Sequence, residues 1–227
     1  MAKKKISRKK LLKEPDEFLT KTGKLIQYAT QYQKQIAWGA GIILVLLIMI
    51  VSLNQISKSN EKKAFDLYNK AVAKYGASLA DTGPEKAYDN VKSDFNHILD
   101  EYSGKSGGKL ARVAFADICY NAGDADAAIA MYKTAMDDLG GDPTFKQIIV
   151  SSLGYAYELK ADLDNAIRYF EMISTGASNF LKSSSLFSLG RLYEKKGDRD
   201  KSIAAYRKIE SDFPTSRYLS IVREKTD

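Results

Sequence analysis

Residues Gly197 to Tyr206 read GDRDKSIAAY, and two earlier segments align with them without gaps. These are ADLDNAIRYF at 161–170 and GDADAAIAMY at 123–132, so the spacings are 36 and 38 residues. Repeats of this length are typical of stacked supersecondary units. The sequence before each copy, from 110, 146 and 183 onward, has helical periodicity. The sequence therefore predicts an all-α fold whose unit is a helix, a turn and a second helix.

Each position of the shared pattern has a physical role in such a unit. The small residue that opens it ends the first helix, where a tight or left-handed backbone is needed. The first Asp can cap the second helix, and the second Asp places charge at the positive end of its dipole. A small residue then lets the helices approach, and an aromatic residue fills the gap beside it. In pattern order the residues are Gly123, Ala161 and Gly197; Asp124, Asp162 and Asp198; Asp126, Asp164 and Asp200; Ala128, Ala166 and Ser202; Tyr132, Phe170 and Tyr206.

The pattern resembles the tetratricopeptide repeat, which has Leu-Gly, a Tyr, then small, aromatic and aliphatic positions and a Pro. The middle repeat has Ser178 in place of the Pro, and the first has Ala116 and Cys119 in place of the Gly and Tyr. The resemblance implies an α-solenoid of three repeats over 109–216, preceded by a linker helix and degenerate leading repeat over 56–108. A capping segment over 217–227 would follow. The last repeat matches with Leu189, Gly190, Tyr193, Ser202, Tyr206, Ile209 and Pro214.

Upstream of the repeats, Ile36 to Leu53 read IAWGAGIILVLLIMIVSL and carry no charge. A helix of these eighteen residues reaches roughly 27 Å, close to the hydrocarbon thickness of a bilayer. A cleaved signal peptide has a shorter apolar core, and no A-x-A-like cleavage site follows this one. We therefore expect an N-terminal transmembrane helix, an uncleaved signal anchor over 36–55.

The distribution of charge indicates how the chain is oriented. Of 35 Lys and Arg and 28 Asp and Glu, ten basic and three acidic residues lie in 1–35, whereas 54–227 carry 25 of each. Because basic flanks are retained in the cytoplasm, we expect the N terminus inside and the C-terminal domain in the periplasm of a bacterial inner membrane. The basic residues form a tail and not a face of the folded domain. This favours anionic lipid headgroups over nucleic acid as their partner.

Helical periodicity continues on both sides of the apolar stretch. Before it, apolar residues from Phe18 to Ile36 predict an amphipathic helix starting near Pro15, which either lies on the membrane surface or extends the span. After it, no Gly or Pro interrupts residues 54–75, so we expect the helix to continue and to end at Gly76 and the DTGP run. The glycine-rich SGKSGG at 103–108 is expected to be a loop.

The combination of a basic tail, one span and an exported repeat domain resembles the YfgM-like ancillary subunits of the bacterial Sec translocon. The resemblance implies a domain beside the Sec channel that passes emerging chains to periplasmic chaperones. The segment YRKIESDFPTSRYL at 206–219 is also similar to repeats of outer-membrane assembly and Tol-Pal accessory proteins. Those proteins are exported as lipoproteins or in soluble form, which the expected membrane anchor of this chain contradicts. The alternative function is an envelope scaffold that links the inner membrane to outer-membrane or cell-wall machinery.

In the tetratricopeptide fold the first helices line a concave groove, and the repeat register gives its outward positions. They combine aromatic and charged groups, as a groove for a peptide or a partner helix does. Ordinary solvated or inter-repeat contacts would also fit, and the sequence leaves both interpretations open. The Lys and Asn of the family's carboxylate clamp are absent, so recognition of a C-terminal carboxylate is not implied. The predicted groove residues are Val113, Asp117, Tyr120, Ser151, Tyr155, Glu158, Phe187, Arg191 and Glu194.

No set of residues converges on catalysis, on a metal or on a cofactor. His97 is the single histidine, so one chain cannot form an imidazole cluster. Cys119 is the single cysteine and falls where the repeat places a buried residue, so a core thiol is expected and not a nucleophile. The Asp-x-Asp pairs lack the twelfth-position carboxylate of an EF-hand loop. We therefore expect a non-enzymatic protein whose partners are other proteins.

Overall fold

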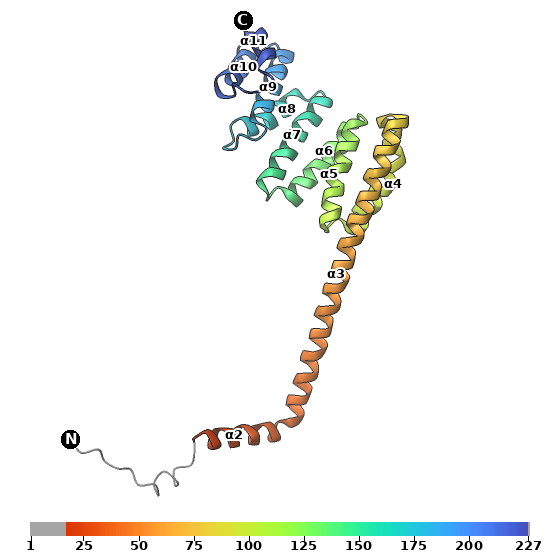
Figure 1. Ribbon diagram of the computed structural model, residues 1–227, viewed down its shortest axis with the longest axis vertical. Coiled ribbons are helices and arrows are strands. Elements are labelled where there is room, and N and C mark those ends of the chain that lie inside the picture. Colours follow the sequence, from red (N-terminus) through yellow and green to blue (C-terminus); the bar gives the residue numbers. More distant parts are fainter. Residues whose placement is uncertain (1–16, 227) are drawn as a thin grey trace, which may run out of the picture. The chain divides into compact units, whose positions relative to one another are not determined.

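The computed structural model describes residues 17–226, which form ten helices and no strand (Figure 1). The predicted all-helical fold is confirmed. The chain divides into two compact units, the first ending at Lys58 and the second beginning at Ser59. The basic tail up to residue 16, with the predicted helix start at Pro15, lies outside the described residues.

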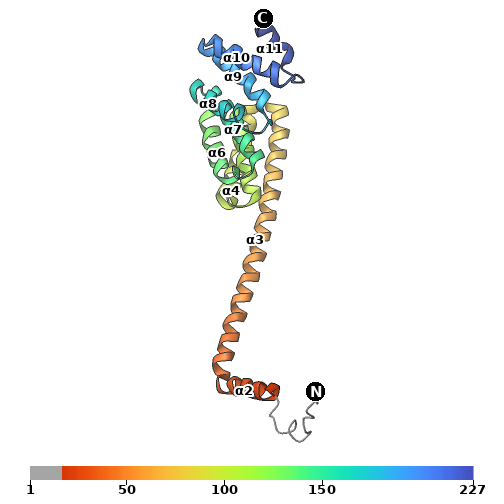
Figure 2. The same ribbon diagram turned by 90° about the vertical axis from the view of Figure 1, so that its left-hand side faces the viewer.

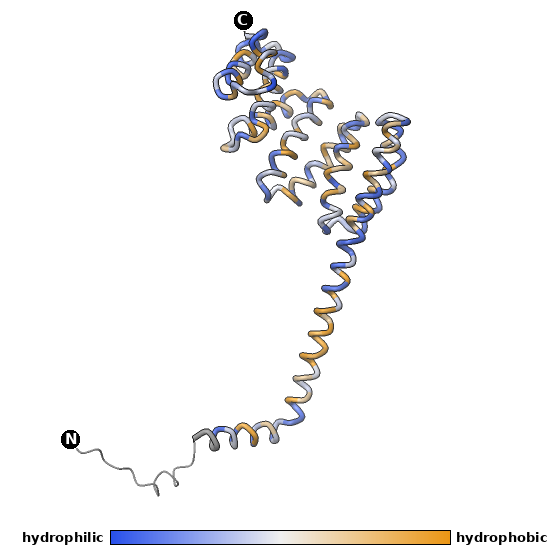
Figure 3. Tube along the Cα trace, viewed as in Figure 1, coloured by the Kyte–Doolittle hydropathy of each residue, from blue (hydrophilic) through white to orange (hydrophobic). Residues whose placement is uncertain are grey.

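The first unit contains α2 (Glu17–Gln31) and the apolar part of α3 (Gln33–Thr82). The two helices are interrupted at Tyr32, where the chain turns (Figure 1) and the rings of Tyr28 and Tyr32 stack with centroids 6.2 Å apart. The apolar stretch of α3 is the long orange segment of Figure 3. Its large side chains are exposed, Trp38 to 77% and Val51 to 67%. By length and composition, α3 is the one helix among residues 17–226 that could cross a membrane.

Helix α3 does continue beyond the apolar stretch, but the prediction that Gly76 helps to end it is wrong. The helix passes through Gly76 and ends at Thr82. A lone glycine within a long helix costs only its extra backbone entropy, which neighbouring turns can offset. The DTGP run does end the helix, because Gly83 has a φ of +80° and Pro84 starts the next one.

In the second unit, the C-terminal section of α3 lies beside α4 (Pro84–Tyr102), as Figure 2 shows. Lys74 Nζ contacts Asp94 Oδ2 at 2.7 Å, and Asn90 Nδ2 donates to Ser78 Oγ at 2.7 Å. Ala71 of α3 and Phe95 and Ile98 of α4 are buried in the same apolar core. This helix pair precedes the three sequence repeats.

Helix α5 (Ser106–Asn121) begins inside SGKSGG, so the prediction of a loop over 103–108 is wrong for its last three residues. Gly107 and Gly108 are buried in the first turn of the helix. A Cβ on Gly107 would lie 2.6 Å from the backbone of Ala64 in α3, and a Cβ on Gly108 would overlap the Tyr102 carbonyl. These glycines therefore permit close approach of backbone to backbone and do not form a flexible loop.

The three predicted helix pairs follow one another, and each helix packs on the next. A short last helix packs on the final pair. The pairs are α5 with α6 (Ala125–Leu139), α7 (Pro143–Leu159) with α8 (Leu163–Ser174), and α9 (Lys182–Lys196) with α10 (Arg199–Asp212), and the last helix is α11 (Leu219–Thr226).

The turns inside the three pairs have the predicted conformation. Gly123, Ala161 and Gly197 adopt φ values of +84°, +63° and +78°. The Asp that follows each turn residue accepts a hydrogen bond from the backbone N–H three positions further on, which caps the second helix. The bonds are Ala127 N–H to Asp124 at 3.1 Å, Asn165 N–H to Asp162 at 3.1 Å and Lys201 N–H to Asp198 at 3.2 Å.

The second Asp of the pattern has a further role that the sequence did not suggest. Lys160 Nζ lies 2.6 Å from Asp126 Oδ1, and Lys196 Nζ forms the equivalent ion pair with Asp164. In each case the lysine at the end of one first helix reaches the preceding repeat. Both pairs are exposed to solvent, so each contributes at most about 1 kcal/mol, but together they favour one stacking register.

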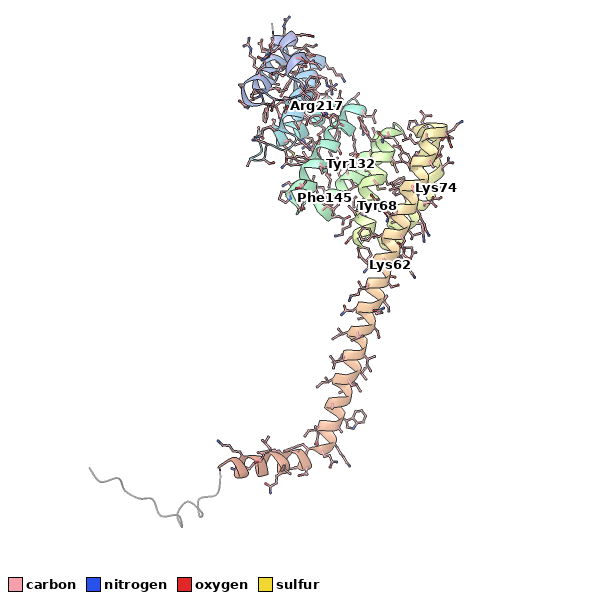
Figure 4. The ribbon with its side chains drawn as sticks, in the orientation of Figure 1. Lys62, Tyr68, Lys74, Tyr132, Phe145 and Arg217 are labelled. Carbon is pink, nitrogen blue, oxygen red and sulfur yellow. The ribbon has the colours of Figure 1, made fainter. Side chains whose placement is uncertain are left out.

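The aromatic residue of each second helix is buried, as predicted for a residue that fills the gap between the paired helices, and in the last two repeats it faces a glycine of the first helix. Tyr132, labelled in Figure 4, is 2% exposed, and Phe170 is fully buried. A Cβ on Gly154 would lie 2.8 Å from Cζ of Phe170, and a Cβ on Gly190 would overlap the ring of Tyr206. The glycine of the Leu-Gly pair therefore sets how closely the helices approach.

Candidate functional site

The nine predicted groove residues lie on α5, α7 and α9, the first helix of each repeat, and their exposure differs. Asp117 and Glu194 are exposed, and Ser151 is buried at 9% exposure. The other six are half-buried, which means that much of their surface already contacts the protein. These six are Val113, Tyr120, Tyr155, Glu158, Phe187 and Arg191.

The centre of the predicted groove is a junction between α7 and α9. Ser188 Oγ donates a hydrogen bond to the Tyr155 hydroxyl at 3.3 Å. The Tyr155 ring packs edge-on against Phe170 with centroids 4.9 Å apart. This aromatic side chain is therefore held by neighbours in both adjacent helices, which fixes its position before any partner arrives.

Glu158 is the most heavily paired charge of this junction. Arg191 donates to both of its oxygens, at 3.2 and 3.0 Å, and Lys195 Nζ lies 2.5 Å from Oε1. Burial alone would raise the pKa of Glu158, but the hydrogen bonds from Lys195 and Arg191 outweigh it, and the pKa lies below its usual value. The bidentate pair of Arg191 with Glu158 also fixes the orientation of α9 against α7.

The shift at Glu158 predicts a pH dependence of stability. Because the folded-state pKa is lower than that of the unfolded chain, the ionised form stabilises the fold above the unfolded value of about 4.3. This contribution is lost as the pH falls through the folded-state pKa. We expect Glu158→Gln to lower the midpoint of chemical unfolding at pH 7 and to flatten the decline of the midpoint below pH 4.3. Glu101→Gln, at an exposed position of α4, should change neither quantity.

Helix α11 and the turn before it cover the C-terminal end of the predicted groove. The rings of Phe187 and Tyr218 stack with centroids 4.4 Å apart. Lys225 Nζ lies 3.1 and 3.3 Å from the two oxygens of Glu194. Burial and the nearby Glu194 carboxylate raise the pKa of Tyr206 to about 12. Phe187 is therefore engaged within the chain, whereas Glu194 still faces solvent.

At the other end, α5 adds a second polar contact. The Tyr132 hydroxyl donates a short hydrogen bond to Asp117. Although part of the Asp117 side chain faces solvent, the carboxyl oxygen that contacts buried Tyr132 is shielded from water. This burial raises the pKa of Asp117, and the bond from Tyr132 offsets only part of the rise. Burial and the negative charge of Glu158 raise the pKa of Tyr120. Tyr120 of α5 is therefore close enough to Glu158 for the carboxylate charge to act on its hydroxyl.

The structure thus brings four of the predicted residues together, namely Tyr120, Tyr155, Glu158 and Arg191. It uses Ser151 and Phe187 mainly for packing. Asp117 and Glu194 lie at the two ends, partly exposed to solvent, and each is bound within the chain, Asp117 by Tyr132 and Glu194 by Lys225. Sequence reasoning missed several residues that hold this surface. Lys195 follows Arg191 by four residues and so lies on the same face of α9, and its ion pair with Glu158 could have been suspected for that reason. The other contacts depend on the fold. The missed residues are Tyr132, Ser188, Lys195, Tyr218 and Lys225.

The two residues with reactive side chains that the sequence singled out lie apart from this surface. Cys119 is fully buried, and burial raises the pKa of its thiol to about 11, so it is protonated at neutral pH. His97 is exposed on α4. Across residues 17–226, no three His, Cys, Asp or Glu side chains are grouped so as to hold a metal ion.

The fold and this surface define an α-helical repeat domain of the kind that binds other proteins. The chain belongs to the tetratricopeptide repeat-like domain family, whose model matches residues 27–227. Domains of this family are typically non-enzymatic modules that bind other proteins, which supports the expectation of protein partners. A comparison with curated proteins finds no match.

Proposed function

We propose that this protein is a non-enzymatic adaptor that is tethered to the bacterial inner membrane by α3. Its repeat domain would lie in the periplasm and dock protein partners near the Sec translocon or periplasmic chaperones. The proposal includes the division of the chain into a cytoplasmic tail, an anchor at 36–55, a leading segment at 56–108, repeats at 109–216 and a cap at 217–227.

The observation that carries the proposal is the exposure of the apolar part of α3. Every large side chain from Ile36 to Leu53 is at least half exposed. Exposed apolar surface costs about 25 cal/mol per Å² in water, so a run of this length is not stable without an apolar environment. A bilayer supplies that environment along the whole stretch, and a helix satisfies its own backbone hydrogen bonds there.

The orientation rests on the basic residues before the helix. They favour a cytoplasmic N terminus and contact with anionic headgroups. The domain that follows is electrically neutral by count and contains no charge excess that would hold it in the cytoplasm. The resemblance to YfgM-like translocon subunits supports the same arrangement.

The surface for partners is proposed to be the face formed by α5, α7 and α9. The cluster around Tyr155 and Glu158 is fixed by internal contacts, which lowers the entropy cost of binding. Asp117 and Glu194 lie at its ends, and the part of each side chain that faces solvent would contact a bound chain first.

Protease accessibility tests the anchor and its orientation. In cells carrying a C-terminal epitope, protease added to intact spheroplasts should remove the epitope, while the membrane fraction keeps an N-terminal fragment. Retention of the epitope on intact spheroplasts would contradict the periplasmic domain. Its recovery in a soluble fraction of untreated cells would contradict the anchor.

Photo-cross-linking in cells tests the partners. A photoreactive amino acid at Asp117 or Glu194 should capture translocon subunits, chaperones or exported chains, because both positions are exposed on the proposed face. The same amino acid at exposed Arg207, on the second helix α10, is the matched control and should capture them much less. Capture of outer-membrane assembly or cell-wall factors alone would favour the envelope scaffold over the adaptor.

A further inference from the structure

A second groove lies between α6, α7 and α8. It consists of two adjoining pockets of about 230 and 510 Å³ that share Lys146, Val150 and Met172. We call it the α6–α8 groove. Successive helical residues are rotated by about 100°, so Lys146 and Val150 face a different side of α7 from Tyr155 and Glu158. The α6–α8 groove is therefore separate from the surface described above.

The floor of the α6–α8 groove is apolar. Val150 and Leu153 of α7 form its base and are 3% and 2% exposed. Met136 and Met172 flank them from α6 and α8, and Met172 remains 49% exposed. Methionine side chains are flexible and polarisable, so they adapt to apolar groups of different shape. The floor thus suits side chains such as Leu, Met or Phe from another chain.

The rim of the α6–α8 groove is positively charged. Lys133, Lys146 and Arg168 line the pocket together with one carboxylate, Asp137. Lys133 Nζ lies over the Tyr157 ring at 5.7 Å, and the Arg168 guanidinium lies over the Tyr169 ring at 5.1 Å. Ring contacts of this kind hold a cation in place without neutralising its charge. A local excess of positive charge stands out because residues 54–227 carry equal numbers of basic and acidic groups.

The smaller pocket also contains a buried acceptor that nothing in residues 17–226 satisfies. Gln147 Oε1 is inaccessible to solvent and receives no hydrogen bond from the described residues. Gln147 lines this pocket next to Lys146. A buried acceptor without a donor is destabilising, and a small movement of the amide toward a bound backbone N–H would satisfy it.

We propose that the α6–α8 groove binds an acidic, amphipathic protein segment. Its apolar side chains would enter between Val150 and Met172, and its carboxylates would contact Lys133, Lys146 and Arg168. The concave apolar floor fits side chains inserted from a peptide better than the flat headgroup layer of a membrane. This second surface goes beyond the adaptor proposal, because it neither requires the translocon nor uses the face of α5, α7 and α9.

Peptide binding to the full-length chain in phosphatidylcholine nanodiscs tests the proposal. The probe is a fluorescent peptide in which Asp and Glu alternate with Leu and Met, and its matched partner carries Asn and Gln instead. The acidic peptide should bind about tenfold more tightly than the amide peptide. Lys133→Glu with Lys146→Glu should weaken its binding by about tenfold or more, and Met172→Ala by about fivefold.

Arg207→Glu with Lys208→Glu is the matched control, since it changes the net charge equally at exposed positions of α10. It should leave the affinity within about twofold, with helical circular dichroism unchanged in both double variants. Equal weakening by the two double variants would overturn the proposal, and so would equal affinity for the two peptides. Tighter binding of soluble short-chain phosphatidylglycerol than of the acidic peptide, measured directly and weakened by Lys133→Glu with Lys146→Glu, would assign the groove to lipid and also overturn the proposal.

Discussion

Gly190→Leu is expected to lower the free energy of unfolding of the second unit by about 3 kcal/mol. A Cβ at this position would overlap the ring of Tyr206, with Cδ1 of that ring only 2.6 Å away. Tyr206 is 1% exposed, so its ring is enclosed by neighbouring side chains and can move only if they move too. The added side chain must push α9 away from α10. Urea unfolding of residues 59–227, followed by circular dichroism, measures the change.

The same substitution at Gly76 is the matched control for Gly190→Leu. Gly76 also lies within a helix, but an added Cβ there would meet nothing within 4 Å. Leucine has the higher helix propensity, so Gly76→Leu should leave stability unchanged or raise it by up to about 1 kcal/mol. Equal destabilisation at the two positions would show that loss of a glycine, and not overlap with Tyr206, is responsible.

A double-mutant cycle locates the cause at the aromatic ring. Tyr206→Leu removes the atoms that a Cβ at Gly190 would meet, so Gly190→Ala should cost less in that background than in the natural chain. The two residues are in direct contact, and a coupling of about 1–2 kcal/mol is expected. Strict additivity would place the helix contact elsewhere.

The parts of this fold that could be predicted depend on contacts between residues that lie near each other in the sequence. The cap of α8 joins Asp162 to the N–H of Asn165, and the turn before it depends on Ala161 alone. Both are visible in ten residues of sequence. The aromatic and small positions of the repeat were predictable for a similar reason, because their spacing follows from the helical period.

The parts that could not be predicted depend on residues far apart in the chain. Helix α5 starts at Ser106 because its N–H is bound by Glu61, 45 residues earlier, and because Gly107 meets the backbone of α3. Glu158 forms a hydrogen-bonded ion pair with Arg191, which lies 33 residues later in the chain. The position of a residue in the repeat predicts which side of the helix it faces. It does not predict whether the side chain is already bound by a residue of the neighbouring repeat.

The α6–α8 groove illustrates the same limit. Its cations come from three helices, and no window of the sequence contains them together. Each taken alone is an ordinary exposed charge on a helix. Only their convergence around Val150 and Met172 distinguishes this surface from the rest of a neutral domain.

Gly107→Leu is expected to detach the C-terminal section of α3 from α5. The new side chain would begin 2.6 Å from the backbone carbon of Ala64 and the nitrogen of Phe65, and backbone atoms of a helix cannot move aside singly. The separation would also break the hydrogen bond from the Ser106 N–H to Glu61 Oε1, now 2.8 Å long. Hydrogen exchange of residues 60–75 in the full-length chain should accelerate by roughly 30- to 100-fold, equivalent to about 2–3 kcal/mol of lost protection.

Gly104→Leu separates this effect from a general loss of stability, because Gly104 lies three residues earlier, is exposed and has nothing within 4 Å of an added Cβ. It should leave exchange in α3 unchanged. In the Gly107 variant, exchange in α8 and α10 should also stay unchanged, since each repeat contacts mainly its neighbours and the disturbance is confined to the first. Acceleration along the entire solenoid would mean that α3 is part of the folding core. Acceleration in α3 alone would mean that one close contact at Gly107 fastens this section of α3 to the repeats, and that the repeats keep their fold when it is released.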